Sequence, residues 1–188
     1  MSSNAIVSFD DEPLILVDAT DTEIGFAKKQ ECHAANGILH RAFSVFLIND
    51  DNQVLLQQRS EQKSLWPLFW SNACCSHPRR GEDLTQAVVR RLSEELGVNA
   101  SVNYLFKFQY QAYFKNIGAE NELCHVFIGC LNKAISPNKN EIAATRWILA
   151  DKLDGELLEN NINYTPWIKL EWQRIRGEFG GNLQLLAG

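Results

Sequence analysis

The sequence lacks the features of a membrane or secreted protein. No apolar run approaches the ~20 residues that a membrane-spanning helix needs. The N-terminal segment MSSNAIVSFDDE has neither a basic start nor an apolar block, so we expect no secretory signal. There is also no C-x2-C pair, the spacing that zinc fingers use. We therefore expect neither a membrane partner nor a zinc-finger fold.

Cysteine is scarce, and its count is odd. The five cysteines are Cys32, Cys74, Cys75, Cys124 and Cys130. An odd number without a leader peptide favours reduced thiols over a disulfide framework. We therefore expect a cytoplasmic protein in which any chemistry at a thiol depends on the groups around it.

Positive charge is also in short supply. The 188 residues carry 18 Lys and Arg against 23 Asp and Glu, for a net charge of -5. A nucleic-acid-binding protein presents a basic face, so we expect no nucleic-acid partner. Apolar residues make up 45%, an ordinary value for one globular domain. Any anionic ligand must then be held by a local group of basic side chains.

Strand and helix patterns are mixed along the chain. Aromatic and β-branched runs between turn residues predict strands, and a 3.6-residue periodicity predicts helices. The predicted strands are Pro13–Val17, His40–Ile48, Gln53–Arg59, Tyr104–Phe114, Leu123–Leu131 and Thr145–Leu149, the predicted helices are Leu84–Gly97, Asp151–Asn160 and Pro166–Arg176, and Lys63–His77 is expected to be irregular. Several strands fit antiparallel pairing, so we predict an α+β fold rather than a doubly wound sheet.

The first predicted helix carries two charged residues in an unexpected place. Its apolar stripe consists of Leu84, Ala87, Val88 and Leu92. Arg91 and Glu95 fall within about 20° of Leu84 on a helical wheel, inside that stripe. They form either an ordinary i,i+4 surface ion pair or a buried pair that serves an anion or a metal, because buried charges need such partners.

Histidines and paired carboxylates suggest a metal site. The chain has only four histidines, and His40 opens a predicted strand. Glu120 and Glu122 have i,i+2 spacing, which directs both to one face of an extended chain, where they repel unless a cation or a proton lies between them. Three imidazoles and two carboxylates suit a divalent transition metal, whereas His125 has the opposite parity to Glu122 and is left out. For each histidine alone, a buried hydrogen-bonded role is the alternative.

The segment SNACCSHP, beside two tryptophans, is the candidate for thiol chemistry. Cys75 and His77 have i,i+2 spacing, so an extended backbone directs both to one face. Cys74 fits a small buried hydrophobic residue. A nearby metal or imidazole would tune the acidity of Cys75, and a glutamate in the same pocket would complete an acid/base pair.

Basic residues from separate segments offer an anion site. These are Lys29, Arg59, Lys63 and Arg91. Each alone fits a solvated surface side chain. A diphosphate would need several of them together, with arginine as the bidentate clamp.

The first predicted helix also resembles a degraded Nudix box, whose pattern is G-x5-E-x7-R-E-U-x-E-E-x-G-U with U aliphatic. The matching positions are Ser76, Glu82, Arg90, Arg91, Leu92, Glu94, Glu95, Gly97 and Val98. Ser76 replaces the leading glycine. Arg91 replaces the glutamate that, in Nudix hydrolases, belongs to the cluster binding catalytic magnesium. The resemblance therefore argues against ordinary diphosphate hydrolysis.

The altered box, with an H-x6-H spacing and the segments SNACCSHP and ENE, is similar to the type 1 isopentenyl-diphosphate isomerases over about residues 13–175. This resemblance implies the Nudix fold, with a mixed or antiparallel sheet packed between helices. It also implies interconversion of isopentenyl and dimethylallyl diphosphate in isoprenoid biosynthesis. We expect residues 1–188 to form one domain, with flexible ends of about 12 N-terminal and about 10 C-terminal residues.

The resemblance implies a role for each candidate site residue. It implies metal ligands at His33, His40, His77, Glu120 and Glu122, a ligand to magnesium on the substrate diphosphate at Glu95, and diphosphate contacts at Lys29, Arg59, Lys63 and Arg91. Cys75 and Glu122 would flank the isoprenyl end, with Tyr110 beside Glu122. Trp172 matches, in the segment TPWIKLEW, the aromatic residue that faces the cationic intermediate, and Trp167 is its rival.

The implied cofactors are a divalent metal at the His/Glu site, either Mn²⁺, Mg²⁺ or Zn²⁺, and Mg²⁺ with the substrate. The implied partner is a small isoprenoid diphosphate, and we expect a monomer. An isolated alkene is a very weak base, so its protonation needs a strong, positioned acid in a dry pocket. Cys75 and Glu122 supply two proton carriers, and the sequence does not determine which protonates first.

Two alternatives remain at this point. One is a Nudix hydrolase acting on a nucleoside diphosphate derivative, which Arg91 argues against. The other is a catalytically silent Nudix-fold binding module, which would have no need of Cys75, Glu122 and the histidines.

Overall fold

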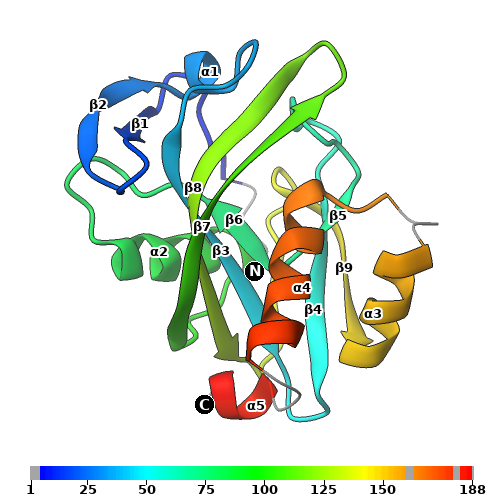
Figure 1. The fold of residues 1–188 in the computed structure, drawn as a ribbon. Helices are drawn as coiled ribbons and strands as arrows, with labels where there is room; N and C mark the ends of the chain where they lie inside the picture. Colours follow the sequence, from blue (N-terminus) through cyan, green and yellow to red (C-terminus); the bar gives the residue numbers. More distant parts are fainter. Residues whose placement is uncertain (1–4, 160–162, 180–182, 188) are drawn as a thin grey trace.

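The computed structural model describes residues 5–159, 163–179 and 183–187. Within them, nine strands form one mixed, strongly curved sheet with helices on both sides (Figure 1). The predicted α+β class, with a mixed sheet packed between helices, is confirmed. No helix in this part of the chain is long and apolar enough to cross a membrane.

The strands and helices follow the predicted order. They are β1 Pro13–Val17, β2 Glu23–Lys28, α1 Lys29–Cys32, β3 His40–Ile48, β4 Gln53–Arg59, β5 Trp70–Ser71, β6 Cys74–Ser76, α2 Leu84–Leu96, β7 Val102–Phe114, β8 Gly118–Cys130, β9 Ile142–Leu149, α3 Ala150–Glu159, α4 Pro166–Glu178 and α5 Leu183–Ala187. Each predicted strand and helix is present, with shifts of a few residues at the ends except in β8.

Strand β3 is the hub of the sheet. It runs parallel to β8 along its whole length, with His40 opposite Glu122. It runs antiparallel to β6, with Ser44 opposite Cys75. Strand β7 continues the sheet beyond β8 and places Tyr110 opposite Glu122. These three pairings place His40, Cys75, Glu122 and Tyr110, which are far apart in the sequence, on neighbouring strands.

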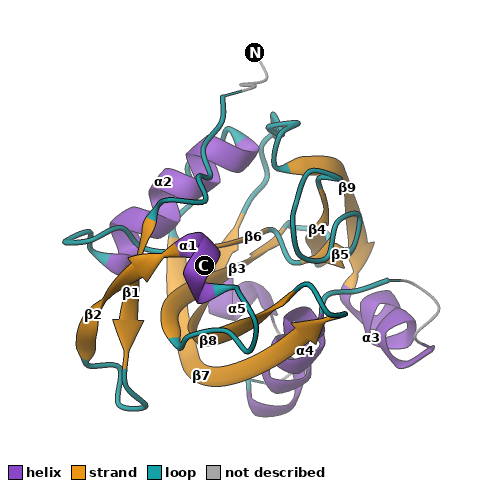
Figure 2. Cartoon of the chain, turned by 90° about the horizontal axis from the view of Figure 1, so that it is seen from above, coloured by secondary structure: helices purple, strands orange, loops and turns teal. Residues whose placement is uncertain are grey.

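The side chains of β3 alternate between two cores, as the twofold period of a strand requires. Phe46 and Ile48 face the core under α3, α4 and α5. Phe43, Val45 and Leu47 face the core under α2. Figure 2 shows α2 on one side of the sheet and α4 and α5 on the other. A strand buried on both faces explains why this run is almost continuously apolar.

Helix α2 begins and ends where its sequence predicts. The Asp83 side chain accepts hydrogen bonds from the backbone N–H groups of Thr85 (2.8 Å) and Gln86 (3.3 Å). Gly97 ends the helix with φ 68°, a left-handed conformation that glycine adopts without strain. Arg91 and Glu95 are 2% and 3% exposed, so their predicted place in the apolar stripe is confirmed.

Three local predictions need correction. Strand β8 begins at Gly118 rather than Leu123, so the two glutamates lie within the strand and not before it. The segment expected to be irregular, Lys63–His77, contains β5 and β6, which are short because each pairs over only two or three residues. Helices α1 and α5 and strand β2 have no predicted counterpart.

The chain ends contain described and undescribed parts. Residues 1–4, 180–182 and 188, on which part of the expectation of flexible ends falls, lie outside the described residues, as does Asn160 of the third predicted helix. Among the described N-terminal residues, the carbonyl oxygen of Val7 accepts a hydrogen bond from Arg91 Nη1 at 2.7 Å. The N-terminal segment therefore passes beside α2, and α5 packs under the sheet.

Candidate active site

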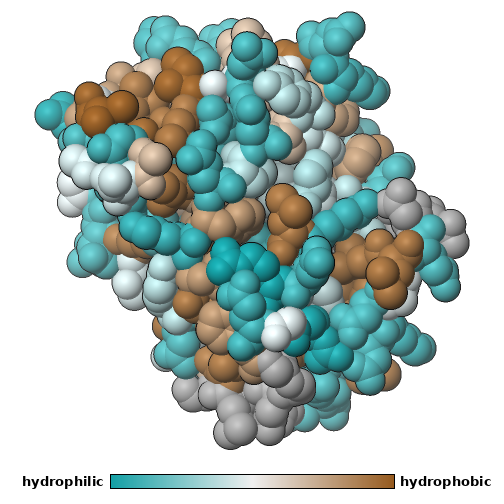
Figure 3. Space-filling model, in the orientation of Figure 1, coloured by the Kyte–Doolittle hydropathy of each residue, from teal (hydrophilic) through white to brown (hydrophobic). Residues whose placement is uncertain are grey.

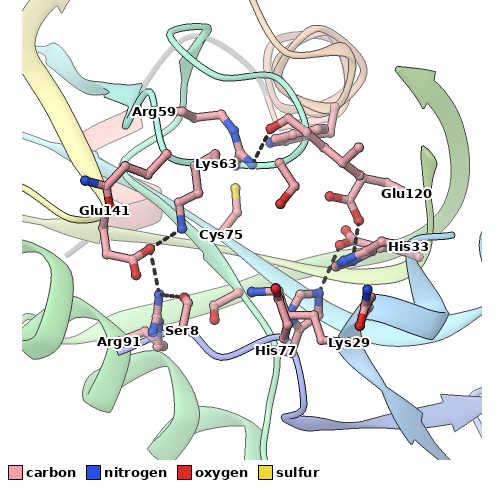
Figure 4. Close-up of a pocket in the computed structure, with 18 of the residues that line it drawn as sticks. Ser8, Lys29, His33, Arg59, Lys63, Cys75, His77, Arg91, Glu120 and Glu141 are labelled. Atoms are coloured by element: carbon pink, nitrogen blue, oxygen red, sulfur yellow. Dashed lines mark hydrogen bonds and ion pairs between the residues drawn. The ribbon is translucent and has the colours of Figure 1, made fainter. Parts of the chain in front are cut away.

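A cavity of about 470 Å³ lies where β6, β7, β8 and the 59–65 segment meet. This volume is within the range of small-molecule sites. Figure 4 shows Lys63, Arg91 and Glu141 on one side, His33, His77 and Glu120 on the other, and Cys75 between them. The cavity therefore has a cationic end and a histidine–carboxylate end.

The histidine–carboxylate end gathers five side chains from four segments. They are His33, His40, His77, Glu120 and Glu122, and one ligand atom from each lies within 4.8 Å of all the others. His125, excluded by its parity, instead binds Asp21 through Nε2 at 2.9 Å on the other side of β8. The alternation of side chains along β8 thus places Glu120 and Glu122 on one face of the strand and His125 on the other.

The donor atoms of this cluster are directed at a common point. The Ile38 carbonyl can only accept, so His40 Nδ1 donates to it at 2.7 Å, and His40 Nε2 is left facing the cluster. His33 Nε2 and Glu120 Oε2 are 2.8 Å apart, yet neither has a well-directed hydrogen bond among the described residues. Two buried, opposed ligand atoms without such a bond are what a shared cation would satisfy. The residues therefore fit a divalent metal.

Electrostatics in the cluster favours charged carboxylates. Burial opposes ionisation of Glu122, but hydrogen bonding and charge from His40 outweigh it and lower the carboxyl pKa. Burial likewise opposes ionisation of Glu120, and the charge of His33 outweighs it, so that pKa is also lowered. Burial, with the neighbouring His40, holds the pKa of His77 well below its usual value. His77 is therefore neutral, as a metal ligand must be.

Two groups able to carry protons, the Glu122 carboxyl and the Cys75 thiol, line the same cavity. Tyr110 donates its hydroxyl hydrogen to Glu122 Oε2 at 2.7 Å. Cys75 Sγ donates to Asn72 Oδ1 at 2.9 Å and lies 3.2 Å from Ser44 Oγ. Burial raises the pKa of the Cys75 thiol. Cys74, its neighbour, points the other way and is fully buried in the core under α2.

The four predicted diphosphate contacts, Lys29, Arg59, Lys63 and Arg91, all line the cavity. Burial, reinforced by Lys63 and Arg91, lowers the pKa of Lys29. The guanidinium of Arg59 is fixed by two hydrogen bonds, which its Nε and Nη2 donate to the carbonyls of Trp66 (3.1 Å) and Leu65 (2.9 Å). Lys29 is repelled by Lys63 and Arg91, and an anion would relieve that repulsion.

Arg91 is the anchor of this end, and its partners are mostly acidic. It donates from Nε to Glu95 Oε1 at 3.0 Å and from Nη2 to Glu141 Oε2 at 3.4 Å. Glu95 lies behind Arg91 and is not among the side chains that line the cavity. Glu141 does line it, and also pairs with Lys63. Burial opposes ionisation of Glu141, but the two cations outweigh it and lower its pKa to about 2.

Two cavity residues that contact Arg91 were not singled out by the sequence. Glu141 lies in the loop before β9, and Ser8 in the N-terminal segment accepts from Arg91 Nη2 at 3.3 Å. Neither belongs to a periodic segment, so no pattern marks them. Their place follows from the tertiary path of two loops.

The structure places Trp172 outside the cavity, contrary to the expectation for it. Trp172 packs on Phe46 in the core, and its indole nitrogen donates to Asp154 at 2.6 Å. Trp167 lines the cavity instead, and its indole nitrogen donates to Ser71 Oγ at 2.9 Å. Five residues on a helix turn about 140°, so the two rings face opposite sides of α4.

Comparison with known proteins decides the family. The NUDIX domain model matches residues 38–169. The chain is 43% identical over 167 residues to isopentenyl-diphosphate Delta-isomerase 1 of Photorhabdus laumondii, an alignment that covers 87% of this chain and 94% of that protein. The chain belongs to the isopentenyl-diphosphate Delta-isomerase family of NUDIX proteins. It is also 40% identical over 157 residues to the isopentenyl-diphosphate Delta-isomerase of Nocardia farcinica, covering 83% of this chain and 90% of that protein.

Solved structures support the NUDIX fold of this isomerase-family chain. A crystal structure from Deinococcus radiodurans superposes with a TM-score of 0.72 at 20% identity, covering 87% of this chain and 98% of that one. A MutT protein of Methanosarcina mazei superposes with a TM-score of 0.64 at 16% identity, covering 76% and 96%. At such low identity these likenesses concern the fold alone.

Proposed function

We propose that this chain interconverts isopentenyl and dimethylallyl diphosphate. The observation that carries the proposal is one cavity holding a thiol, Cys75, a tyrosine-bound carboxylate, Glu122, and four cations. The first two groups suit proton transfer and the cations suit a diphosphate. Relatives that align over nearly their whole length bear the name of this reaction.

The reaction moves a double bond by adding one proton and removing another. One group gives a proton to the terminal CH₂ carbon, which leaves a tertiary cation at the adjacent carbon. A second group removes a proton from the CH₂ on its other side. Cys75 and Glu122 are the two groups, and each turnover leaves one with the proton that the other has lost. Exclusion of water protects the cation from capture.

Trp167 is the side chain that we assign to stabilise this cation. An indole face attracts positive charge without being a good nucleophile. The bond to Ser71 fixes the ring, and the Arg59 guanidinium carbon lies 5.3 Å from the ring centroid. Trp167 therefore lies in the wall of the cavity beside one of its four cations.

The five-residue cluster at the other end would hold Mn²⁺, Mg²⁺ or Zn²⁺. When bound, the ion supplies positive charge that keeps two buried carboxylates ionised and acidifies the groups beside it. Tyr110 orients Glu122 through Oε2, so that Glu122 can be held through one oxygen and exchange a proton at the other. The sequence assigned Glu95 to an Mg²⁺ that arrives with the diphosphate, but Glu95 is buried behind Arg91 and outside the lining of the cavity, so we assign it instead to hold Arg91 in place.

Removal of metal should remove activity. We expect a chelator to abolish turnover, and His40→Ala or His77→Ala to weaken metal binding by at least about tenfold, since each loses a ligand from a shared centre. His125→Ala is the matched control, because this histidine lies outside the cluster. Metal content is read by elemental analysis. Full metal content in both cluster variants would make these histidines structural.

Loss of Arg91 should weaken substrate capture. We expect Arg91→Ala to raise KM by at least about tenfold, because a buried positive charge that lines the cavity is lost. Arg90→Ala is the control, since Arg90 binds Glu82 and does not line the cavity. Steady-state kinetics and denaturant unfolding are measured on both. An unchanged KM with reduced stability would show that Arg91 and Glu95 form only a structural salt bridge.

The proposed function is tested with the purified protein, isopentenyl diphosphate and a divalent metal. We expect the dimethylallyl isomer by proton NMR and no release of phosphate by phosphorus NMR. Cleavage of nucleoside diphosphate derivatives would favour a hydrolase instead. Binding of the diphosphate without conversion would favour a silent binding module.

We further propose that the enzyme acts as a monomer in the cytoplasm. All five cysteines are free thiols, as a reducing compartment maintains them. On the face drawn in Figure 3, apolar residues form separate groups among hydrophilic ones rather than one continuous band. Such a surface gives no obvious subunit contact on that side. Light scattering at several protein concentrations measures the oligomeric state.

A further inference from the structure

A carboxyl group that the mechanism does not use lies deep behind the cavity. Glu171 is on α4, one turn after Trp167 and on the same face of the helix. Its side chain is 0% exposed. Its Oε2 atom makes no hydrogen bond with any residue that the structure describes. A buried carboxylate in this state is costly, so the group calls for an explanation.

Glu171 is linked to Cys75 through two small side chains. The Cys124 thiol lies 3.5 Å from Glu171 Oε1 and 3.5 Å from Ser44 Oγ, and its single hydrogen serves one of them at a time. Ser44 Oγ in turn lies 3.2 Å from Cys75 Sγ. The register between β3, β6 and β8 holds this chain of contacts in place. A change of charge at Glu171 therefore acts on a group that touches the proton-carrying thiol.

Ser44 is the one neighbour able to donate a hydrogen bond to Cys75 Sγ among the contacts described for that thiol. Asn72 cannot, because its amide nitrogen is engaged by the carbonyls of Val45 and Cys74, both at 3.1 Å. Its oxygen, which only accepts, faces Cys75. The direction of the Ser44 hydroxyl hydrogen therefore decides whether Cys75 receives a donor when it lacks its proton.

The environment of Glu171 keeps it protonated at neutral pH. Burial raises its carboxyl pKa to about 8, and the hydrogen-bonding side chains Ser44 and Cys124 only partly offset this. The ionisable groups around it are Cys124 and Glu122 from β8 and Cys75 from β6. No cation is among the groups that act on it.

We propose that Glu171 is a positioning residue for proton transfer at Cys75: as a neutral acid it leaves the Ser44 hydroxyl free to point at Cys75 Sγ, and as a carboxylate it draws that hydroxyl away. A neutral acid keeps one carbonyl oxygen, a weaker acceptor than a carboxylate, and the Cys124 thiol lies 3.5 Å from Oε1, so it competes little for the hydrogen of Ser44. A carboxylate only accepts and competes for it. This inference rests on the proposed isomerase function.

The consequence is a limit on activity in alkaline solution. Ionisation of Glu171 turns the Ser44 hydroxyl hydrogen away from Cys75 and adds a negative charge near the thiol. Turnover should therefore fall as the pH rises through about 8. Ionisation of Glu171 therefore makes the enzyme less active in alkaline than in neutral solution.

The test is the pH dependence of kcat in wild type, Glu171→Gln and Ser44→Ala. The amide of Glu171→Gln is neutral at every pH and nearly isosteric with the acid. We expect it to keep wild-type kcat within about threefold at neutral pH, and to shift the alkaline loss upward by at least about one pH unit. Ser44→Ala should lower kcat at neutral pH, and in its background Glu171→Gln should no longer move the alkaline limb. The matched control is Glu178→Gln, since Glu178 is an exposed residue of the same helix and is bound to Arg174.

Equilibrium unfolding gives a second readout that does not depend on turnover. In the unfolded chain Glu171 loses its proton near its ordinary pKa of 4.5, whereas in the folded chain it keeps the proton up to about 8. Folding therefore binds a proton in this window, and the wild type loses stability as the pH rises through it. The stability advantage of Glu171→Gln should grow from about pH 4.5 to about pH 8 and then level off.

The outcomes separate this inference from the proposed function. An isomerising wild type whose alkaline limb is unchanged in Glu171→Gln would overturn the role of Glu171 alone. A stability difference between wild type and Glu171→Gln that does not change with pH would show that Glu171 is not neutral in the folded protein. A uniform loss of activity at all pH values would make Glu171 a packing residue. A wild type without isomerase activity would overturn both proposals.

Discussion

Cys75→Ala is expected to reduce isomerisation by at least about a thousandfold, because one of two proton carriers is removed. The loss should appear in kcat, since Cys75 lies between the two ends of the cavity and is not one of its cations. Metal content should be unchanged, because Cys75 is outside the five-residue cluster. Turnover, bound metal and diphosphate affinity are measured on the same preparation.

Cys74→Ala is the matched control, since the two thiols are adjacent in the chain and point to opposite faces of β6. Cys74 contacts the α2 core, so its loss should lower stability by about 1–2 kcal/mol and leave kcat within about threefold. Equal losses of activity in the two variants, with both folded, would remove Cys75 from the mechanism.

Glu122→Gln separates proton transfer from metal binding. The amide keeps the size and one ligand oxygen of the carboxylate but cannot shuttle a proton. We expect it to retain part of its metal and its diphosphate affinity, and to lose about 10²–10⁴-fold in turnover per metal-loaded molecule. The amide of the new glutamine can present either its oxygen or its nitrogen to the Tyr110 hydroxyl, and only the oxygen preserves the hydrogen bond that Tyr110 makes to Glu122. Fold and metal content are therefore measured before turnover.

Glu120→Gln is the partner experiment. Glu120 pairs with His33 and has no contact with Tyr110 among the described hydrogen bonds. Its loss should lower metal content but change the turnover of loaded molecules much less. If metal-normalised turnover of Glu122→Gln stayed near wild type, Glu122 would be only a ligand, and the proton carrier would lie elsewhere.

Local periodicity predicted much of the site correctly. The helical wheel placed Arg91 and Glu95 inside the apolar stripe of α2, and both are buried there. Strand parity placed Glu120 with Glu122 and excluded His125, as the structure shows. These relations depend on the backbone geometry of one element, which a short stretch of sequence specifies.

Relations between elements were harder to predict. The parallel register that sets His40 opposite Glu122 joins strands about 80 residues apart, and no local pattern encodes it. The rotation of α4 decides that Trp167 lines the cavity while Trp172 faces the core. Both faces of this helix carry a tryptophan, so its sequence does not distinguish them. Glu141 lies in a loop whose position depends on two strands of the sheet.

The central claim is that one cavity adds a proton to the alkene and removes another, with Cys75 and Glu122 as the two carriers. The most direct measurement is incubation of isopentenyl diphosphate with the metal-loaded enzyme in heavy water, followed by proton and deuterium NMR. We expect dimethylallyl diphosphate with deuterium in the newly formed methyl group, and no such product from Cys75→Ala or Glu122→Gln. Unconverted substrate, conversion without deuterium in that methyl group, or release of phosphate in place of isomerisation would contradict the account.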